Sequence, residues 1–599
     1  MASLEALLSW AKKKGSKVSS EIEFKESSDS GNAAYVSKDI KSAQIKIPVS
    51  IALKLSDAIE GFGSEFEDLV PKTKNINTLL KLFLAYERVP ENLDKSTFKA
   101  YIASLPQFPE MRACPYLWSP EETAQLKGSN LGSSLRENIA NLVEEWWSII
   151  NILPESIEKP KEHFINMKFY YEQKFHTDEE LHGYIIGEGS NFNNWTSFPS
   201  YLWASMIFKS RSFPGYLLKD SASAKAIDYQ QEDSAVLLPV IDLLNHNPSS
   251  EVFWSVKNDQ FVFETKSPLK KDEQLFNNYG QKGNEELLLA YGFCIDNNEA
   301  DSVALKVKVP LEMLPELEAN GMVLPKISDY TTSVVTGEEK RKSTNYEDYK
   351  DGLLFFITKK HVPENLILLF QWLVKSKWEK DLSLRMRLSG LNHLRQAVES
   401  KAGLLNYSKL PADSSNPNTV NTRIYLKSQK KILDAAVKHI KHMEKALLDE
   451  KKNSLLTLKG VYKRDHTFVR SLLLTMGVTS WEDIVEKQLM DQIWLLYLIR
   501  CYNRDEYIKT KKDEEQNYLP EWIKKAFQKM DAETEMDAAE VVQFRQLYEN
   551  MIIPMNSSVP EIYNKGKWTV RELIVSTKLL DTIGFVRGKE QECILVAPE

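Results

Sequence analysis

Residues 239–246 read PVIDLLNH, and residues 277–293 read NNYGQKGNEELLLAYGF. In the first stretch an apolar run ends in Asn245 and His246, two residues rich in hydrogen-bonding groups, where a buried strand would leave the core. The second stretch places Tyr279 before a glycine turn, then predicts a leucine-rich helix, and ends in a second Tyr-Gly pair. Either stretch alone is weak evidence, because Asn-His can cap a helix and Tyr-Gly is a common turn. Their occurrence together and in this order is the informative feature.

Strand signals lie on both sides of these stretches. Residues 34–36 and 45–48 alternate apolar and polar side chains around a turn at Lys38 and Asp39, which predicts a half-buried hairpin. Residues 77–153 instead carry apolar side chains three and four positions apart, the period of an amphipathic helix. Further strands are expected at 235–241, 252–256 and 261–263. The pattern predicts a strand-rich module that is interrupted by helices.

Beyond about Val309 the chain reads as mostly helical, with leucine-rich stripes through 384–394 and 433–447 that we interpret as core packing. We predict an α+β fold in three parts. These are a β-rich domain with a helical insert, a helical domain that binds the substrate, and a C-terminal extension that is helical and then strand-like. Their predicted bounds are 1–300 with the insert at about 61–200, then 301–520, then 521–599.

Composition narrows the class of protein. Of the 599 residues, 42% are hydrophobic and 27% are charged, which is ordinary for globular domains and excludes a wholly disordered chain. The net charge of -7 argues against nucleic acid as a direct partner and suits a basic protein partner. Four isolated cysteines fit a reducing compartment.

Targeting and membrane signals are weak. Leu4, Leu7 and Trp10 predict an amphipathic helix, and the lysines that follow it are on the wrong side for a secretory signal. The apolar run 366–374 is too short to span a bilayer. We expect an intracellular monomer without a membrane partner, in the cytoplasm, with the nucleus as the second compartment to test.

Several cofactor and metal signatures are absent. The stretches 61–66 and 187–192 begin like a dinucleotide loop, but both lack its third glycine, and 584–589 has the wrong spacing for a phosphate loop. His439 and His442 lie one helical turn apart without an evident third ligand, so we expect no metal site. The chain also contains neither a His-Glu-x-x-His helix nor a Gly-x-Ser-x-Gly elbow.

The two quoted stretches together resemble the SET-domain methyltransferases of the Rubisco large-subunit methyltransferase type. Residues 101–106 and 118–122 resemble the helical insert of that family, and 210–213 resembles its arginine segment. The resemblance covers roughly residues 20–300 and more loosely the helical part beyond. It implies a SET-domain fold, S-adenosylmethionine as the cofactor, and protein-lysine N-methylation as the activity. The chain looks closest to fungal ribosomal-protein and elongation-factor lysine methyltransferases, which implies a ribosomal protein or translation elongation factor as substrate.

The resemblance also implies roles for individual residues. Tyr279 would be the catalytic residue that aligns the acceptor amine, and Tyr291 would line the lysine channel. The cofactor would be held by Asn32, Ala33, Ala34, Arg211, Asp242, Asn245, His246, Tyr279 and Phe293. Each residue also has a structural interpretation: a turn tyrosine over a glycine, a strand-end histidine, a surface salt bridge, or aromatic core packing.

One position departs from the family pattern. Members of the family usually open with Gly-x-Gly, whereas this chain has Ala33 where the second glycine is expected, in the stretch 31–34. If that position needed a positive φ, alanine would carry an energetic cost that glycine does not. The resemblance therefore predicts a cofactor contact at Ala33, but it does not predict the affinity of that contact.

Methyl transfer to lysine does not require a dedicated base. Removing a proton from an amine of pKa about 10.4 costs roughly 4–5 kcal/mol at pH 7. A sulfonium about 4 Å away repels the ammonium form by roughly 4 kcal/mol at an effective dielectric near 20. Positioning is then the main catalytic task.

Three alternatives stay open on the residues alone. The chain could be a non-catalytic SET-fold module that binds a protein, a protein-histidine methyltransferase, or an all-helical scaffold with accidental motifs. Cofactor binding, the identity of the methylated side chain, and the presence of strands distinguish them.

Overall fold

The computed structural model describes residues 2–27, 31–326, 345–377, 379–411, 414–587 and 592–598. These residues form two compact units. The N-terminal unit contains 2–304 and 401–432, and the C-terminal unit contains 305–326, 345–400 and 433–598. The fold is α+β, as predicted. The predicted further boundary at residue 521 stays a prediction.

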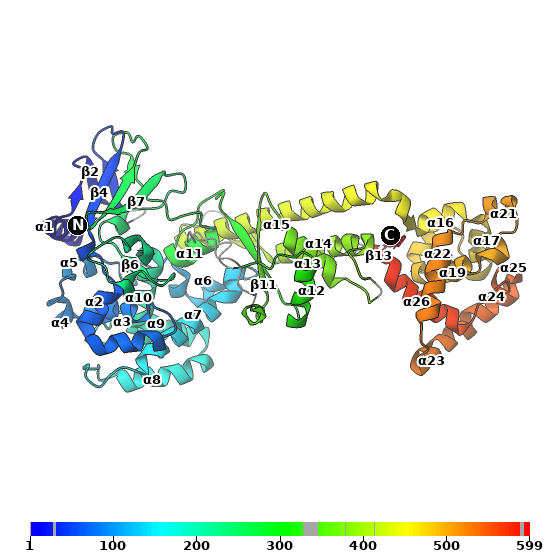
Figure 1. Ribbon diagram of the computed structural model, residues 1–599, viewed down its shortest axis with the longest axis horizontal. Helices are drawn as coiled ribbons and strands as arrows, with labels where there is room; N and C mark the ends of the chain where they lie inside the picture. The colour runs from blue at the N-terminus through cyan, green and yellow to red at the C-terminus, as the bar shows by residue number, and fades with distance from the viewer. Residues whose placement is uncertain are drawn as a thin grey trace. The chain divides into compact units, whose positions relative to one another are not determined.

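Two sheets form the β-rich part of the N-terminal unit. Their strand orders are β1-β4-β8-β7 and β2-β3-β9. Each sheet joins strands from the first fifty residues to strands beyond residue 250, and Figure 1 shows β2, β4 and β7 together at one end of the unit. The strands are β1 (Lys17–Val18), β2 (Ile22–Ser27), β3 (Gly31–Val36), β4 (Ala43–Pro48), β7 (Val252–Lys257), β8 (Gln260–Thr265) and β9 (Gln274–Leu275).

The predicted hairpin between residues 34–36 and 45–48 is wrong. Both segments are strands, but β3 pairs with β2 and β9, whereas β4 pairs with β1 and β8. Between them Ile40 forms a bridge with Leu269, which directs the two strands into different sheets. The alternation of side chains does predict the buried face of β4, since Ile45 and Ile47 are fully buried. Alternation identifies a strand and its faces, but it carries no information about the partner strand.

Helices fill the middle of the N-terminal unit, as expected for an insert. Helix α10 is buried along most of its length and packs against α3, α7, α9 and α11. It ends at Arg211 and continues directly into the short strand β5 (Ser212–Pro214), so Arg211 lies at the junction between the buried helix and that strand. The helices are α1 (Ala2–Lys13), α2 (Leu55–Phe62), α3 (Thr78–Glu87), α4 (Pro90–Leu93), α5 (Lys99–Ile102), α6 (Pro120–Ala124), α7 (Asn130–Ile150), α8 (His163–Glu172), α9 (Asp178–Glu188), α10 (Phe198–Arg211) and α11 (Asn284–Tyr291).

The C-terminal unit is mainly helical, with a small sheet of order β12-β14-β13. Its core surrounds α19, where Trp494 is fully buried and Arg500 pairs with Asp465, both without exposure. Helices α14 (Leu384–Leu404) and α15 (Pro417–Glu450) contribute residues to both units. The other elements beyond residue 300 are β10 (Ser302–Val307), α12 (Leu314–Ala319), β11 (Leu353–Thr358), α13 (Glu364–Leu373), β12 (Leu455–Thr457), α16 (Leu458–Arg464), α17 (His466–Met476), α18 (Trp481–Glu486), α19 (Met490–Tyr502), α20 (Arg504–Tyr507), α21 (Lys511–Gln516), α22 (Glu521–Glu533), α23 (Ala538–Leu547), α24 (Ile553–Ser558), α25 (Pro560–Tyr563), α26 (Val570–Ile583), β13 (Gly584–Arg587) and β14 (Glu592–Val596).

The described residues contain neither a candidate membrane span nor a candidate metal site. No helix among them has both the length and the apolar character needed to cross a bilayer. No cluster of three or more His, Cys, Asp or Glu side chains among them could hold a metal ion.

Candidate functional site

The two stretches that opened the sequence analysis lie side by side. His246 forms a parallel bridge with Asn277. The N–H of Asn277 donates to the carbonyl of Asn245 at 2.8 Å, and the N–H of Asn247 donates to the carbonyl of Asn277 at 2.9 Å. Residues thirty or more positions apart are thereby joined through their backbones. This pairing brings Asn245 and His246 next to the segment that carries Tyr279.

The approach to Asn245 is a strained turn rather than the strand predicted over 235–241. Strand β6 covers only Ala235–Leu237, and a 3-10 helix, η7, follows at Ile241–Leu243. Between them Val240 has φ 75° and ψ -43°, a positive-φ conformation near that of a classic γ-turn, which a β-branched residue adopts at an energetic cost. Val240 is also fully buried, so core packing holds it there. The turn sets the chain direction that carries Asp242 into the site.

Tyr279 is held by its backbone and by its hydroxyl. Its N–H donates to Nδ1 of His246 at 3.0 Å, and its hydroxyl donates to the carbonyl of Leu244 at 2.8 Å. The rings of Tyr279 and His246 stack, with centroids 4.9 Å apart and planes 18° apart. Burial raises the pKa of the Tyr279 hydroxyl well above its ordinary value. Tyr279 is therefore neutral at physiological pH and can act as a hydrogen-bonding dipole.

The hydrogen bond to Tyr279 determines the tautomer of His246. Because Nδ1 accepts, the proton of the neutral ring is on Nε2. Burial, and then the positive charge of Lys282, lower the pKa of His246 to about 4, so the ring is neutral at pH 7. Nε2 is buried and has no hydrogen-bond partner in the structure. It is a donor that a bound ligand could satisfy.

Asp242 is a buried carboxylate at the centre of the site. Its Oδ2 accepts from the hydroxyl of Tyr101 at 2.9 Å and lies 3.4 Å from Nη1 of Arg211. The same Nη1 donates to the backbone carbonyl of Asp242 at 3.0 Å. Burial raises the pKa of Asp242, while Arg211 and Tyr101 act in the opposite direction. Oδ1 has no partner in the structure. Arg211 is thus a partner of a fully buried carboxylate, not a surface ion pair.

A row of aromatic rings begins at Tyr279. Tyr291 stacks on Tyr279 with centroids 4.9 Å apart, and Phe293 meets Tyr291 edge-on at 6.2 Å. The turn between the last two rings needs Gly292, which has φ 77° and closes α11. A Cβ on Gly292 would lie 2.7 Å from Cβ of Ala113, so only glycine fits against the helical insert there.

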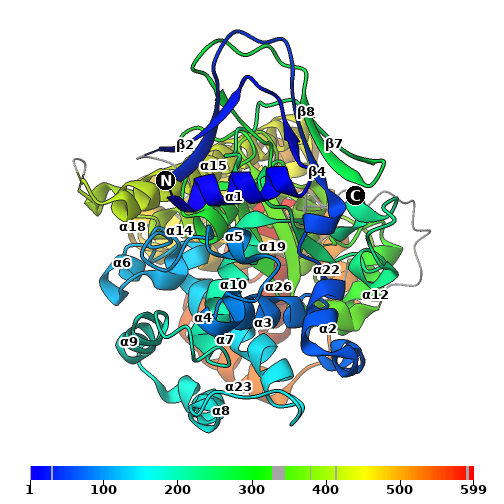
Figure 2. The same ribbon diagram turned by 90° about the vertical axis from the view of Figure 1, so that its left-hand side faces the viewer.

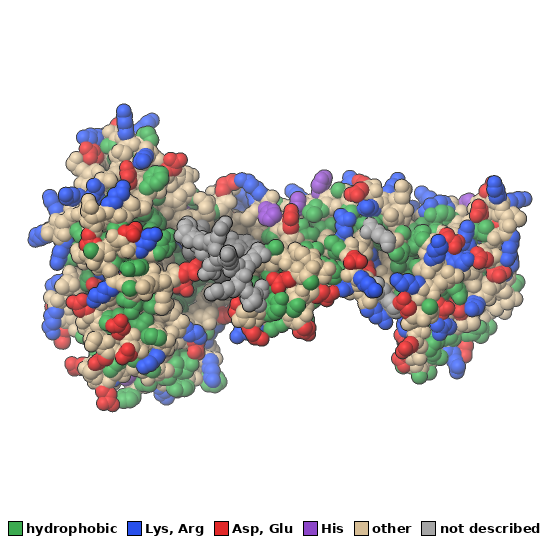
Figure 3. Space-filling model, in the orientation of Figure 1, with side chains coloured by type: hydrophobic (Ala, Val, Ile, Leu, Met, Phe, Trp, Pro, Cys, Tyr) green, Lys and Arg blue, Asp and Glu red, His purple; other side chains and the backbone are tan. Residues whose placement is uncertain are grey.

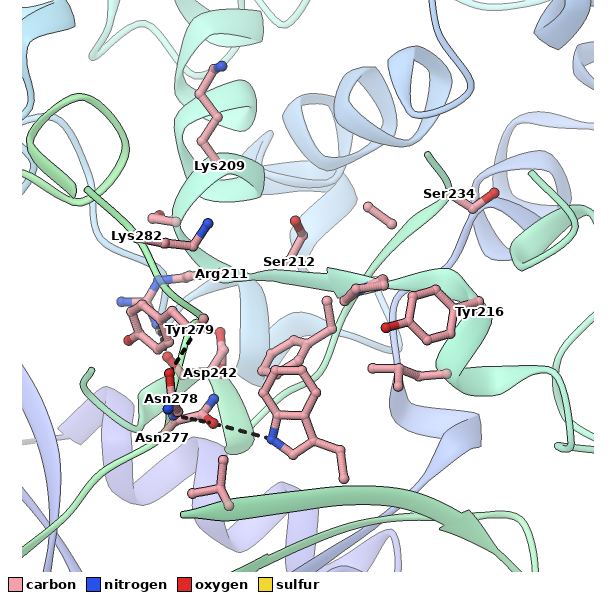
Figure 4. A pocket seen from close by; sticks show the side chains of 18 of the residues that line it. Lys209, Arg211, Ser212, Tyr216, Ser234, Asp242, Asn277, Asn278, Tyr279 and Lys282 are labelled. Atoms are coloured by element: carbon pink, nitrogen blue, oxygen red, sulfur yellow. Dashed lines mark hydrogen bonds and ion pairs between the residues drawn. The ribbon is translucent and has the colours of Figure 1, made fainter. Parts of the chain in front are cut away.

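A groove of about 1210 Å³ opens beside this row. Of the predicted site residues, Arg211, Asp242, Tyr279 and Tyr291 line it. Figure 4 shows Tyr279, Arg211 and Lys282 close together at one side of the groove. The predicted residues Asn32, Ala33, Ala34, Asn245, His246 and Phe293 are not among its lining residues. Tyr279 therefore lies between the groove and the buried donors of the Asn-His segment.

Strand β3 carries the predicted residues Asn32, Ala33 and Ala34 and packs against η7. Ala33 and Ala34 are fully buried. Ala33 has an ordinary negative φ, whereas the positive φ of 67° belongs to Gly31. The expected energetic cost of alanine at this position does not arise in the structure.

Three buried polar atoms of the site have no hydrogen-bond partner, and they indicate what kind of cofactor the site could hold. Nδ2 of Asn245 and Nε2 of His246 are buried donors without partners, and Oδ1 of Asp242 is a buried acceptor without one. Buried polar atoms are costly to leave unpaired, so three of them in one five-residue segment point to a ligand with both acceptors and donors. An amino-acid moiety and a purine carry such groups. The site fits a cofactor of that chemistry.

Tyr101 and Asn284 also belong to the framework of the site, although neither was among the predicted site residues. Tyr101 comes from α5, far from Asp242 in the chain, and is fully buried. Asn284 donates from Nδ2 to the carbonyl of Ile295 at 3.0 Å and accepts from the N–H of Ile295 at 2.8 Å, which clamps α11 to the following loop. Asn284 lies within the stretch 277–293, at the start of the leucine-rich helix, and this place was the signal that could have identified it. For Tyr101 the only available signal was its position in the predicted helical insert.

Two families match the chain. The SET domain family matches residues 90–280, and the EFM1 middle domain matches residues 303–451. The first match ends just after Tyr279.

Two yeast proteins are similar over most of their length. Ribosomal lysine N-methyltransferase 1 of Saccharomyces cerevisiae is 33% identical over 524 residues, which cover 83% of this chain and 86% of that protein. Protein-lysine N-methyltransferase EFM1 of the same organism is 26% identical and covers 99% of this chain and 97% of its own. Among solved structures, the SET domain of LSMT bound to lysine and AdoHcy aligns with 81% of this chain and 98% of its own, with TM-score 0.51 and 16% identity.

Proposed function

Because the chain belongs to the family of SET-domain protein-lysine N-methyltransferases, we propose that Tyr279 is its catalytic residue. The chain is an enzyme that transfers a methyl group from S-adenosylmethionine to a protein lysine. The assignment of Tyr279 rests on its position. Its N–H donates a hydrogen bond to His246, and the residue lines the groove. Tyr279 therefore lies where the segment 242–246, which is proposed to hold the cofactor, meets the groove.

The cofactor is assigned to the buried side of Tyr279. S-adenosylmethionine supplies a methyl group on a positively charged sulfonium. Nδ2 of Asn245 and Nε2 of His246 are the donors available to it. Arg211 would pair with its carboxylate through the part of the guanidinium that Asp242 does not occupy. The backbone of 32–34 and the ring of Phe293 complete the proposed set.

Asp242 is proposed to position Arg211 rather than to react. Its carboxylate is fully buried and paired with Arg211 and Tyr101. Removing one partner would leave a buried charge uncompensated, which is strongly unfavourable. The pair therefore fixes the guanidinium at the edge of the groove.

Tyr279 and Tyr291 are proposed to hold the lysine side chain. Their stacked rings line the groove and provide an apolar wall for the four-carbon stem. Burial of the stem lowers the pKa of the lysine amine, which favours its neutral, nucleophilic form. The neutral hydroxyl of Tyr279 orients the amine without removing its proton.

The groove suits an extended polypeptide. Strand β7 is at the edge of its sheet, and β5 (Ser212–Pro214) pairs only with β6 among the described strands. Residues of both strands line the groove. An edge strand presents unpaired backbone groups, so a substrate segment can add to it as a further strand.

We propose a ribosomal protein or a translation elongation factor as the substrate. The printed names of the similar proteins support this class, and the acidic net charge of this chain suits a basic substrate. A monomeric enzyme without direct nucleic-acid contact, acting in the cytoplasm, is part of the same proposal.

The test is methyl transfer into a defined extract. Labelled S-adenosylmethionine and the purified enzyme are added to extract from cells that lack the protein, and the labelled band is identified by mass spectrometry. A methyllysine in a ribosomal protein or elongation factor is expected. Label on histidine, or no labelled protein at all, would contradict the proposal.

A further inference from the structure

Helix α8 exposes an unusual row of side chains. Phe164 is 81% exposed and Tyr171 is 62% exposed, and Phe175, in the 3-10 turn η4 (Gln173–Phe175) that follows, is 77% exposed. Phe164, Lys168 and Tyr171 are four and three residues apart, so they share one face of the helix. We call Phe164, Lys168, Tyr171 and Phe175 the aromatic ridge. Ile165, 70% exposed, borders it.

The opposite face of α8 anchors the ridge. Phe169 is buried and stacks on Tyr184 at 4.4 Å and on Phe198 at 5.7 Å. Nδ2 of Asn166 donates to Asn194 at 2.6 Å and to Thr196 at 2.9 Å. The exposed face therefore belongs to a firmly packed helix and is presented in a fixed orientation.

The ridge leaves apolar area in water that a partner could bury. Burial of such side chains by a partner is favourable, and soluble proteins rarely expose large contiguous apolar patches without a function. Figure 2 places α8 at the periphery of its unit, and Figure 3 shows apolar side chains among charged ones in that region. None of the four ridge residues lines the catalytic groove.

Charge argues against an anionic surface as the partner. Residues 155–180 contain seven acidic residues and four lysines, a net charge of -3. Lys168 is paired with Glu172 at 2.8 Å, and Lys161 lies 3.7 Å from Glu162. Phosphates of a nucleic acid or an anionic membrane would therefore meet net repulsion, whereas a basic protein surface would be attracted.

Area argues against a second copy of this chain. The ten residues of α8 make a helix about 15 Å long, and packing two such ridges together buries far less than the roughly 800 Å² per partner of a stable interface. A groove that encloses the ridge buries more of each side chain. Aromatic anchors along one helix face are typical of a helix that inserts into such a groove.

We propose that the aromatic ridge docks into an apolar, basic-rimmed groove on the methyl-accepting protein, at a distance from the acceptor lysine. This proposal rests on the proposed function, since it takes the docked partner to be the substrate. The contact would raise the affinity for the folded substrate without touching the reacting atoms. It selects an intact protein over a short peptide that carries the same lysine.

The test separates substrate affinity from chemistry. The labelled protein from the extract assay is partially purified and titrated against the enzyme and its Phe164→Ser/Phe175→Ser variant. We expect KM to rise about tenfold because two anchors are lost, with kcat unchanged. Calorimetric affinity for S-adenosylmethionine and thermal unfolding should also be unchanged, since both side chains point into solvent. The single variant Tyr171→Ser should show a smaller rise of KM.

Val542→Ser is the matched control, because Val542 is 73% exposed but lies on α23, outside the ridge. It should leave KM unchanged. Equal KM values for the unsubstituted enzyme and the double variant would overturn the docking proposal while the proposed function stands. If the unsubstituted enzyme labels no protein, the proposed substrate class fails and the docking proposal fails with it.

Discussion

The backbone N–H of Tyr279 donates to Nδ1 of His246 at 3.0 Å, and the two rings stack with centroids 4.9 Å apart. This contact joins two motifs that are 33 residues apart. It orients Tyr279 and sets the proton of His246 on Nε2, toward the proposed cofactor side. We propose the imidazole as a positioning group, and its role is testable apart from that of the tyrosine.

Tyr279→Phe should lower kcat by roughly 10²–10³, because it removes the single hydroxyl dipole proposed to orient the amine. The hydrogen bond to Leu244 is lost as well, which should lower the free energy of unfolding by about 1 kcal/mol. Single-turnover transfer from labelled cofactor measures the first effect, and urea unfolding measures the second. Full activity in this variant would remove Tyr279 from the mechanism.

His246→Ala should weaken cofactor binding and lower kcat together, because Tyr279 loses its acceptor and the site loses the Nε2 donor. The unpaired N–H should also destabilise the fold by about 1–3 kcal/mol. Calorimetry with S-adenosylmethionine and urea unfolding check the two effects. His439→Ala, at an exposed position on α15, is the control and should change neither.

Acid should destabilise the protein partly through His246. The folded pKa is about 4, below the ordinary value of 6.5, so the unfolded chain takes up the proton first as pH falls. The stability from this residue is fully present above pH 6.5 and is lost between about 6.5 and 4. The free energy of unfolding should therefore fall less steeply between pH 7 and 5 in His246→Asn, whose amide oxygen can still accept from Tyr279. Identical slopes in the two proteins would contradict this.

Tyr101→Phe should cost about 1.5–3 kcal/mol of stability, because a charge-assisted hydrogen bond to the buried carboxylate of Asp242 is lost. Displacement of Arg211 should raise the Kd for S-adenosylmethionine in addition. Tyr116→Phe is a matched control, since Tyr116 is 3% exposed and makes no hydrogen bond to Asp242. Chemical denaturation should show a larger loss of unfolding free energy in Tyr101→Phe than in Tyr116→Phe. Equal losses in the two variants would refute the role of Tyr101 in holding Asp242.

Gly292→Ala should destabilise the protein by more than about 1 kcal/mol, because the residue has φ 77° and a Cβ would meet Ala113 at 2.7 Å. Gly183, inside α9, has open space around its missing Cβ. Gly183→Ala should instead stabilise the protein by about 0.5–1 kcal/mol. Melting temperatures of the two variants, which should move in opposite directions, provide the check.

Local patterns predicted elements well where one face of an element meets the core. The helix predicted after Gly283 is α11, and the strands predicted at 252–256 and 261–263 are β7 and β8. The hairpin failed because pairing depends on residues some two hundred positions away. The strand predicted at 235–241 failed because its buried apolar run also suits a tight turn and a 3-10 helix, which Val240 makes possible.

The sequence by itself determined the class of fold and the chemistry, because the residues of the Asn-His motif, and likewise those of the Tyr-Gly motif, are neighbours in the chain. Only the tertiary structure decided that His246 supports Tyr279, that Tyr101 and Arg211 share Asp242, and that α8 presents aromatic rings to solvent. The physical reason is that hydrogen-bond partners and exposure depend on where distant segments pack, and side-chain periodicity constrains only which face of an element is buried.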